Sequence, residues 1–220
     1  MRNLCRFGYL ATLVVLMLGC ASAPPKHDFA KFREANPQSI LIVPVINKSV
    51  DVNAPDYFLA TISRPLAERG YYVFPVNMVR SVLSDDGLSD ANMVHAGDPR
   101  RLGELFGADA IMYISIERWE AKYVVLATTV TVELNYSLKS AHSGEELWKN
   151  HQTVVYQPQQ SSAGGLAGLL ANAVAAAIAK AAPNYMPLAR QANYGAIYTK
   201  GTGLPAGPHD GSYLKDAVDF

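Results

Sequence analysis

Two short apolar runs stand out in the first half of the chain. The stretches SILIVPVIN (39–47) and YYVFPV (71–76) are rich in β-branched and aromatic residues, and polar residues bound them. Continuous apolar runs of this length are typical of strands that are buried on both faces of a sheet. Pro44 and Pro75 have no N–H to donate, so we expect each to lie at a strand end or at a sheet edge.

A helical pattern separates these two runs. Phe58, Ile62 and Leu66 recur every four residues and predict one apolar stripe, which Gly70 ends. Pro65 lies within this stripe, so the helix is expected to kink or divide there. A strand, a helix and a second strand in this order predict a right-handed parallel unit.

Two more helices are predicted after the second strand. Asn77 is placed to cap a short helix that stops near Gly87. The stretch DPRRLGELFG (98–107) has a stronger pattern, with a capping aspartate, a proline at the first turn, an apolar side and a closing glycine.

The second half of the chain predicts antiparallel strands. ADAIMYISIERW (108–119) indicates a third buried strand, TTVTVELNYSLK (128–139) alternates between apolar and polar residues, and LWKNHQTVVY (147–156) returns after a turn-rich stretch. The alternation places one set of side chains on a buried face: Val130, Val132, Leu134, Tyr136 and Leu138. The predicted fold class is α/β (α+β). It is a mixed sheet with a parallel strand-helix-strand core and an antiparallel meander, with helices mainly on one side.

An alanine- and glycine-rich stretch follows the last strand. SSAGGLAGLLANAVAAAIAKAA (161–182) carries small residues at a spacing that lets helices approach closely. We favour a helix that packs on the sheet or on another subunit; a helix in contact with the membrane and a flexible linker are the alternatives. The residues proposed for an oligomer contact are Gly164, Gly168, Ala171 and Ala175.

The start of the chain resembles a lipoprotein signal. Arg2 and Arg6 precede an apolar stretch (7–18), which ends in Gly19 and Cys20. The stretch is shorter than the roughly 20 apolar residues that a spanning helix needs. The sequence around Cys20 resembles the lipobox of bacterial lipoproteins, in which this cysteine becomes the first mature residue and carries acyl chains such as palmitate.

Lipidation at Cys20 would fix the location of the protein. Each buried methylene contributes about 0.8 kcal/mol, so several chains on one residue hold a protein on a membrane without a spanning helix. Ala21 follows the cysteine; lipoproteins with aspartate there tend to stay on the inner membrane, so the resemblance implies an outer-membrane anchor. We expect the domain to face the periplasm; the outside is the alternative. A plain cleaved signal and an uncleaved anchor are the alternatives.

These patterns divide the chain into four parts. We predict a signal peptide (1–19), a lipid-anchored tether (20–37), a mixed α/β domain (38–195) that includes the small-residue helix near 163–182, and a loop-rich tail (196–220). The tail is rich in glycine and proline and has no sustained period.

Charge and cysteine content exclude some functions. The chain has 19 basic and 19 acidic residues; removal of the two arginines in the signal leaves 17 − 19 = −2, which is no basic footprint for nucleic acid. Cys5 leaves with the signal and Cys20 is acylated on this interpretation, so the mature body has no thiol for catalysis or for zinc.

We find no motif that names a reaction or a cofactor. His142 and His151 face each other across the predicted hairpin only if the register allows it, and they are otherwise surface histidines. The parallel strands should end at a rim that carries Asn47, Lys48 and Asn77, which is a weak binding hypothesis. No metal or other cofactor is predicted, and we expect that the protein is not an enzyme.

Several stretches together resemble one family. The lipobox, SILIVPVIN, RPLAERGYYVFPV, LGELFGADAIMYISIERW, GGLAGLLANAVAAAI and LPAGPHD are similar to a family of bacterial lipoproteins of unknown function that includes a genome-derived neisserial antigen. The resemblance implies a fold like the periplasmic domain of CsgG and the amino-terminal domain of TolB. It also implies a CsgG-like envelope lipoprotein as partner, and it assigns a role to Cys20 alone.

The sequence therefore favours a non-enzymatic outer-membrane lipoprotein that forms oligomers and binds other envelope proteins, in a CsgG-like secretion or transport system. Two alternatives remain at this stage. One is a periplasmic small-ligand-binding protein or envelope enzyme, and the other is a pore subunit that uses the small-residue helix.

Overall fold

The computed structural model describes residues 27–124, 127–156 and 185–220. Over these residues six strands form one mixed sheet in the order β3-β1-β4-β5-β6, with β2 paired to β4. The strands are β1 (Ser39–Ile42), β2 (Ile46–Asn47), β3 (Tyr72–Val73), β4 (Ala110–Val124), β5 (Ala127–Ser140) and β6 (Glu146–Tyr156). The helices are α2 (Ala30–Ala35), α3 (Ala54–Glu68), α4 (Val76–Asp85), α5 (Ala91–Ala96), α6 (Pro99–Phe106) and α8 (Met186–Tyr198).

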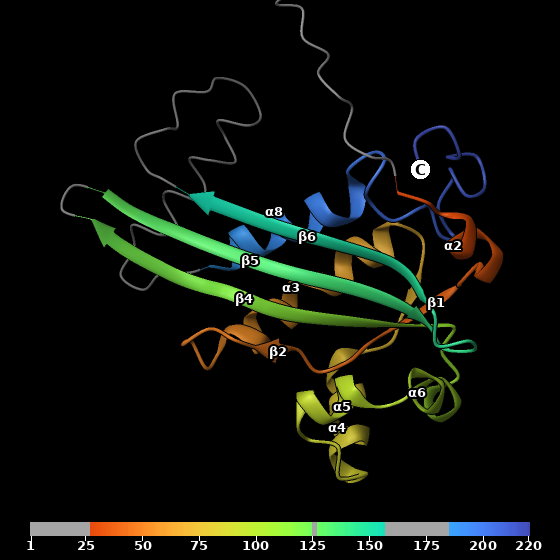
Figure 1. Ribbon diagram of the computed structural model, residues 1–220, viewed down its shortest axis with the longest axis horizontal. Coiled ribbons are helices and arrows are strands. Elements are labelled where there is room, and N and C mark those ends of the chain that lie inside the picture. The colour runs from red at the N-terminus through yellow and green to blue at the C-terminus, as the bar shows by residue number, and fades with distance from the viewer. Residues whose placement is uncertain (1–26, 125–126, 157–184) are drawn as a thin grey trace, which may run out of the picture.

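The sheet has a parallel half and an antiparallel half. Strand β1 pairs in parallel with both β3 and β4, whereas β4, β5 and β6 form an antiparallel meander. Figure 1 shows the three meander strands as long arrows that extend past the short parallel strands. The predicted fold class, a mixed sheet with a parallel unit and a meander, is confirmed.

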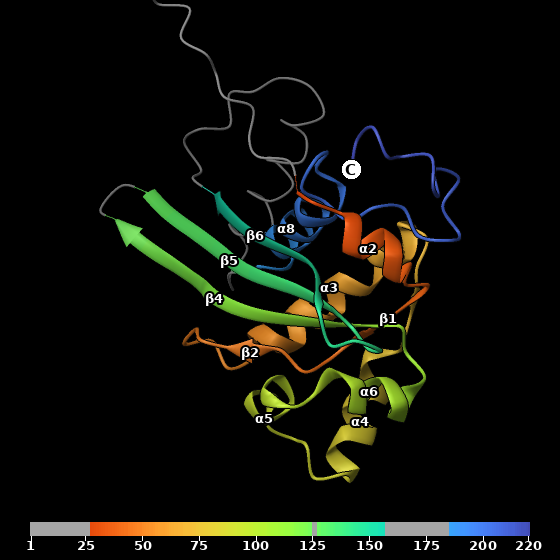
Figure 2. The ribbon, with the colours of Figure 1, turned by 45° about the vertical axis from the view of Figure 1, so that its right-hand side comes forward.

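Helices cover the sheet unequally. Helices α2, α3 and α8 lie on one face, and the smaller group α4, α5 and α6 lies on the other face at the parallel end (Figures 1 and 2). Successive residues of the first strand accordingly enter two separate clusters: Ile40 and Ile42 join the larger one, whereas Leu41 joins the smaller one. A strand buried on both faces is what the continuous apolar run predicts.

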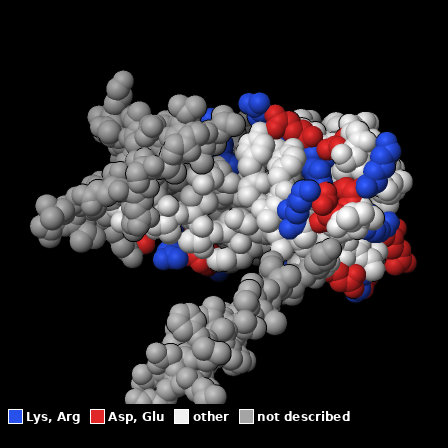
Figure 3. Space-filling view, turned by 90° about the horizontal axis from the view of Figure 1, so that it is seen from above, with Lys and Arg blue, Asp and Glu red and all other residues white. Residues whose placement is uncertain are grey.

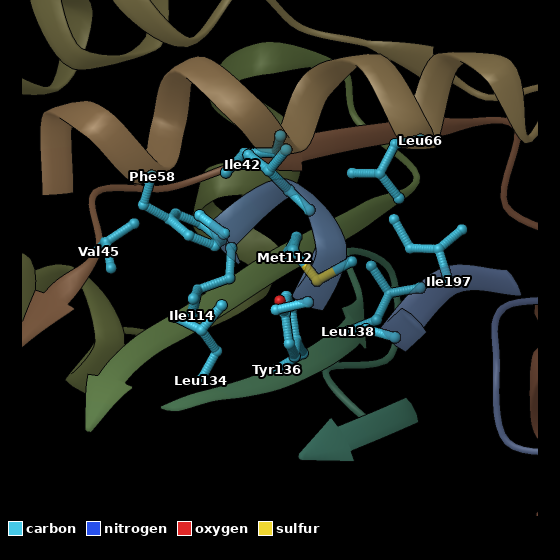
Figure 4. Close-up of a cluster of buried hydrophobic side chains, with 14 of the residues drawn as sticks. Ile42, Val45, Phe58, Leu66, Met112, Ile114, Leu134, Tyr136, Leu138 and Ile197 are labelled. Atoms are coloured by element: carbon cyan, nitrogen blue, oxygen red, sulfur yellow. The ribbon is translucent and has the colours of Figure 1, made fainter. Parts of the chain in front are cut away.

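The larger core lies between α3, α8 and the meander (Figure 4). Phe58 and Leu66 point from α3 towards Met112 and Tyr136 of the sheet, and Ile197 of α8 closes the cluster. The alternating face predicted for β5 is confirmed, since its five apolar side chains are at most 3 % exposed: Val130, Val132, Leu134, Tyr136 and Leu138.

The structure refines the prediction made at Pro44 and differs from the one made at Pro65. The run 39–47 is not one strand, because pairing with β4 stops after Ile42 and resumes at Ile46, on either side of Pro44. Helix α3 neither divides nor stops at Pro65, which is buried four residues before Arg69 and accepts the Arg69 N–H at its carbonyl. Near a helix end, a proline removes only one backbone N–H donor, and the packing of Pro65 in the core keeps the last turn of α3 helical.

Some helices begin earlier or are longer than predicted. Helix α2 lies within the predicted tether, and Phe32 is buried in the larger core. Helix α4 begins at Val76 rather than after a cap at Asn77, and α5 was not predicted. Helix α8 crosses the boundary predicted between the domain and the tail at 195–196. Half of its buried residues are alanines, which give only a weak apolar stripe in the sequence.

Several predictions fall outside the described residues. They are the signal peptide (1–19), the lipidated residue, Cys20, the small-residue helix near 163–182, and the oligomer contact proposed within it: Gly164, Gly168, Ala171 and Ala175. All of them stay predictions.

A carboxylate joins the first strand to the meander. Asp109 precedes β4, and its Oδ2 accepts hydrogen bonds from the Ser39 hydroxyl at 2.8 Å, the Ser39 N–H at 2.9 Å and the Gln38 N–H at 3.1 Å. Burial raises the pKa of Asp109, but the hydrogen bonds from Ser39 and Gln38 outweigh it, so the net pKa is lowered. The ionised form therefore stabilises the fold.

Replacing Asp109 with asparagine is expected to lower the free energy of unfolding at pH 7 by about 1 kcal/mol, because charged acceptors bind N–H and O–H donors more strongly than amides do. A lowered folded pKa gives stability that is present above the unfolded value of about 3.9 and is lost as the pH falls through the folded value. Urea unfolding at pH 7 and pH 3 should show the difference between Asp109→Asn and the native chain shrinking in acid. A constant difference would contradict the prediction.

Candidate interaction groove at the parallel strand ends

A groove of about 190 Å³ opens where the parallel strands end. Strands β1 and β3 both lead into it, and its sides are formed by the start of α3, by α4 and by the loop that leads to α5. This edge is where open sheets with parallel strands usually bind their ligands. Most of the lining is apolar and includes Pro44, Val45, Val52, Leu59, Val76 and Leu88.

One ion pair crosses the rim of the groove. The Arg80 Nη1 of α4 lies 2.8 Å from the Asp56 Oδ1 of α3. Both side chains are more than half exposed, so the pair adds little to stability. The ion pair links α3 and α4 across the opening of the groove. Because Asp56 and Arg80 are exposed, a bound chain can reach both side chains. Val52, which lines the groove, is 84 % exposed, and Val50, two residues earlier on the loop before α3, is 92 % exposed.

A half-buried histidine supports the floor of the groove. The His95 Nε2 of α5 lies 2.9 Å from the carbonyl oxygen of Pro44, so a neutral ring protonated at Nε2 donates to it. The ring also packs edge-on against Tyr113 of β4, at 5.0 Å between centroids. Burial lowers the pKa of His95, and the nearby Lys139 lowers it further, whereas the hydrogen bond to Pro44 opposes both. Burial also raises the pKa of Tyr113 to about 12.

Replacing His95 with glutamine is expected to flatten the pH dependence of stability in mild acid. A folded pKa below the unfolded value of about 6.5 means that the neutral ring stabilises the fold, and that this contribution falls as the pH drops below 6.5. Urea midpoints at pH 7.5 and 5.5 should therefore differ more for the native chain than for His95→Gln. Equal differences in the two proteins would show that His95 does not titrate with folding.

A row of polar side chains crosses the outer face of the meander. Glu117 of β4 accepts hydrogen bonds from Lys48, Ser115 and Asn135, with distances of 2.7–2.8 Å to its Oε1. The first of these, the hydrogen bond from Lys48, is the main cause that lowers the pKa of Glu117. These hydrogen bonds tie Lys48, after β2, to the side chains of β4 and β5.

The two histidines of the hairpin are surface residues, which is the interpretation that the sequence favoured. His151 does not face His142: its Nδ1 lies 2.6 Å from the Asn135 Oδ1 in the middle of the β5–β6 pair, whereas His142 lies in the turn, 3.6 Å from the Asp109 Oδ1. A turn residue cannot reach a mid-strand position, so the alternative of a histidine pair is excluded.

The rim predicted at the strand ends is revised. Asn47 uses its side chain to hold the following turn, through Asp51 and Ser49, and Lys48 binds Glu117. Asn77 is exposed on α4. The groove opens at this edge of the sheet as predicted, but other residues line it. The pairing of Asp56 with Arg80 joins separate helices, and the sequence holds no local signal for it.

The part of the chain that the structure describes contains neither a cluster of metal ligands nor a helix able to cross a bilayer. Within residues 27–124, 127–156 and 185–220, no three histidine, cysteine, aspartate or glutamate side chains gather to hold a metal. None of the helices that the structure describes combines the length and the apolar character needed to cross a bilayer.

Known proteins resemble this chain along most of its length. A family model described as "Putative lipoprotein GNA1162-like" matches residues 27–209. A lipoprotein of Neisseria meningitidis serogroup B, "Putative lipoprotein NMB1124/NMB1162", is 36% identical over 170 residues, which are 77% of this chain and 79% of that protein.

Two solved structures resemble the chain to different degrees. The crystal structure of lipoprotein GNA1162 from Neisseria meningitidis is 36% identical, with a TM-score of 0.55 over 66% of this chain and 100% of that one. A PelC dodecamer from Paraburkholderia phytofirmans is a distant match, 12% identical with a TM-score of 0.39 over 60% of this chain and 78% of that one. That distant likeness carries no inference about assembly.

Proposed function

The chain belongs to the GNA1162-like lipoprotein family, and from this premise we propose that it is an outer-membrane lipoprotein, anchored through acylated Cys20 and facing the periplasm, that works as a non-enzymatic assembly module. In this proposal the groove between α3 and α4 binds an apolar segment of another envelope protein. The CsgG-like lipoprotein that the family resemblance implies is the first partner to test, in a secretion or transport system. Self-association into oligomers is part of the same proposal.

The observation that carries this proposal is the chemistry of the groove. Its lining is mainly apolar, and its charged residues, Asp56 and Arg80, are already paired with each other. Its volume of about 190 Å³ is below the roughly 300–1,000 Å³ of pockets that enclose small molecules. The exposed Val52 of its lining, with the exposed Val50 two residues before it, instead offers an open apolar surface on which a side chain from another protein can dock.

Photocrosslinking in living cells tests the groove. A photoreactive amino acid at Val50 should form one reproducible adduct with an envelope protein, and the same probe at Lys149 of β6, on the outer sheet face, should not. Adding Val52→Asp should reduce the Val50 adduct about tenfold, because loss of one buried valine contact is worth roughly 1.5 kcal/mol. Val52 is 84 % exposed, so the substitution leaves the fold intact. Equal adducts at Val50 and Lys149, or no effect of Val52→Asp, would count against the groove.

Mass spectrometry of the mature amino terminus tests the anchor. The expected species begins at Cys20 and carries a diacylglyceryl thioether. Globomycin, which blocks removal of lipoprotein signals, should cause the precursor to accumulate. A mature chain with a free thiol at Cys20 would contradict the anchor and the location together.

A further inference from the structure

The two ends of the described chain meet on one side of the molecule. The His27 N–H donates to the Gly201 carbonyl at 3.0 Å, and the Gly201 N–H donates to the Asp219 carbonyl at 2.7 Å. Lys200 adds an ion pair to Asp219 at 3.1 Å. Figures 1 and 2 agree, since the first described residues and α2 lie beside the C-terminal tail. We call the surface formed by His27 and residues 199–202 and 212–220 the tail face.

The length of chain before His27 places this face near the anchor. Seven residue steps separate Cys20 from His27, and a fully extended chain spans about 3.6 Å per residue, so the reach is at most about 25 Å. This step rests on the proposed function, because it assumes that Cys20 carries the acyl chains. With that anchor, the tail face is the part of the described domain held closest to the bilayer.

The tail face carries unusual apolar exposure. Val218 is 84 % exposed and Leu214 is 63 % exposed, which places both among the most exposed large apolar residues of the described chain. The neighbouring charges are of both signs: Lys200 pairs with Asp219, and Lys215 donates to the Gly211 carbonyl. Figure 3, which looks down on the side where the tail lies in Figure 1, shows basic and acidic groups interspersed among uncharged residues. A surface of this kind suits zwitterionic lipid better than a strongly charged partner.

The opposite end of α3 carries the groove. Arg69, directly after α3, binds the tail through Leu204 and Asp216, whereas Pro55 and Asp56 at the start of α3 line the groove. A helix of 15 residues is about 22 Å long. The end of α3 at Arg69 therefore lies next to the tail face, which is near the anchor, and the start of α3, which lines the groove, lies away from it.

We infer that the tail face rests on the phospholipid surface into which Cys20 is anchored, with Val218 and Leu214 at headgroup depth, and that the groove consequently points away from the membrane. The anchor supplies the affinity, and the tail face sets the orientation.

Site-directed spin labelling tests this orientation. Cys5 leaves with the signal and Cys20 is acylated, so Val218→Cys gives the mature lipoprotein a single free thiol. The matched control is Met78→Cys on α4, which is 57 % exposed on the other face of the sheet. Both proteins are acylated in cells, labelled with a nitroxide and reconstituted into zwitterionic phosphatidylethanolamine–phosphatidylcholine vesicles.

The two labels should behave differently towards relaxing agents. At Val218 we expect oxygen to relax the nitroxide more strongly than a water-soluble nickel complex does, as at headgroup depth, whereas at Met78 the nickel complex should dominate. Vesicle-bound protein with equal nickel access at both sites would overturn the orientation and leave the anchor intact. Spin–spin broadening at Val218 would overturn it in favour of contact with a second copy. Protein that does not float with the vesicles would overturn the anchor itself, and the proposed function with it.

Discussion

Replacing Arg69 with leucine is expected to lower the free energy of unfolding by about 3 kcal/mol, the lower end of the usual range for breaking a buried ion pair, because the change removes the closer of two cations from a buried carboxylate and leaves only Arg33, whose Nη1 lies 3.9 Å from the Asp216 Oδ1. Arg69 is 7% exposed, and Asp216 is 8% exposed. The Arg69 Nη2 lies 3.1 Å from the Asp216 Oδ2, and the Arg69 Nε donates to the Leu204 carbonyl at 2.8 Å. The guanidinium also stacks 4.7 Å from the centre of the Phe220 ring.

The same substitution should release the tail. Asp216 accepts the Ala206 N–H at 2.6 Å, so the carboxylate holds two parts of the tail together only while its charge is compensated. Gly207 fits against Gly70 so closely that a Cβ at Gly207 would lie 2.7 Å from the Gly70 backbone. The tail therefore depends on tight backbone contact as well as on the ion pair. Limited proteolysis should cut the tail of Arg69→Leu much faster than that of the native chain.

A double substitution separates the contribution of the Arg69 and Asp216 charges to stability from the contribution of packing. Arg69→Leu combined with Asp216→Asn removes both charges, so it should recover much of the stability that Arg69→Leu loses, as measured by urea unfolding. Lys200→Ala, which removes an exposed cation from the same region, is the control and should change stability by less than about 0.5 kcal/mol. A loss below about 1 kcal/mol for Arg69→Leu would show that the tail is held in another way.

The strands and the main helix could be predicted because their signals are local. The alternation in 128–139 fixes which side chains of β5 are buried, and the stripe of Phe58, Ile62 and Leu66 fixes the buried face of α3. The tail gave no such signal. Its glycines and prolines have no period, yet Leu204 and Ala206 are buried, because Arg69 binds the tail from a position 147 residues before Asp216.

The candidate site was only partly predictable, because its contacts, like those of the tail, join residues that are far apart in the sequence. The prediction that a site lies at the ends of the parallel strands follows from topology and places the groove at the correct edge of the sheet. Its residues do not follow from topology: Asp56 and Arg80 meet where α3 and α4, which cover opposite faces of the sheet, both reach the strand ends, and His95 reaches Pro44 across 51 positions. Both contacts depend on tertiary packing, which periodicity does not encode.

Replacing Phe58 with alanine is expected to lower the free energy of unfolding by about 3–5 kcal/mol, the usual range for deletion of a buried phenylalanine. Phe58 is fully buried on α3, and its ring centre lies 6.3 Å from that of Tyr136 on β5. The side chain therefore joins the parallel half of the fold to the meander, and the cavity left by alanine lies between layers that cannot easily close.

The neighbouring residue provides the control for Phe58→Ala. Tyr57 is 45% exposed on the same turn of α3, so Tyr57→Ala makes a similar loss of aromatic volume without a cavity and should cost less than about 1 kcal/mol. Urea unfolding should show a lower midpoint for Phe58→Ala with an unchanged slope, since the surface exposed on unfolding stays the same. Because α3 carries the groove at its start and is followed by Arg69, which holds the tail, Phe58→Ala should also speed proteolysis at both ends together. Faster cleavage at one end alone would mean that α3 does not couple the groove to the tail.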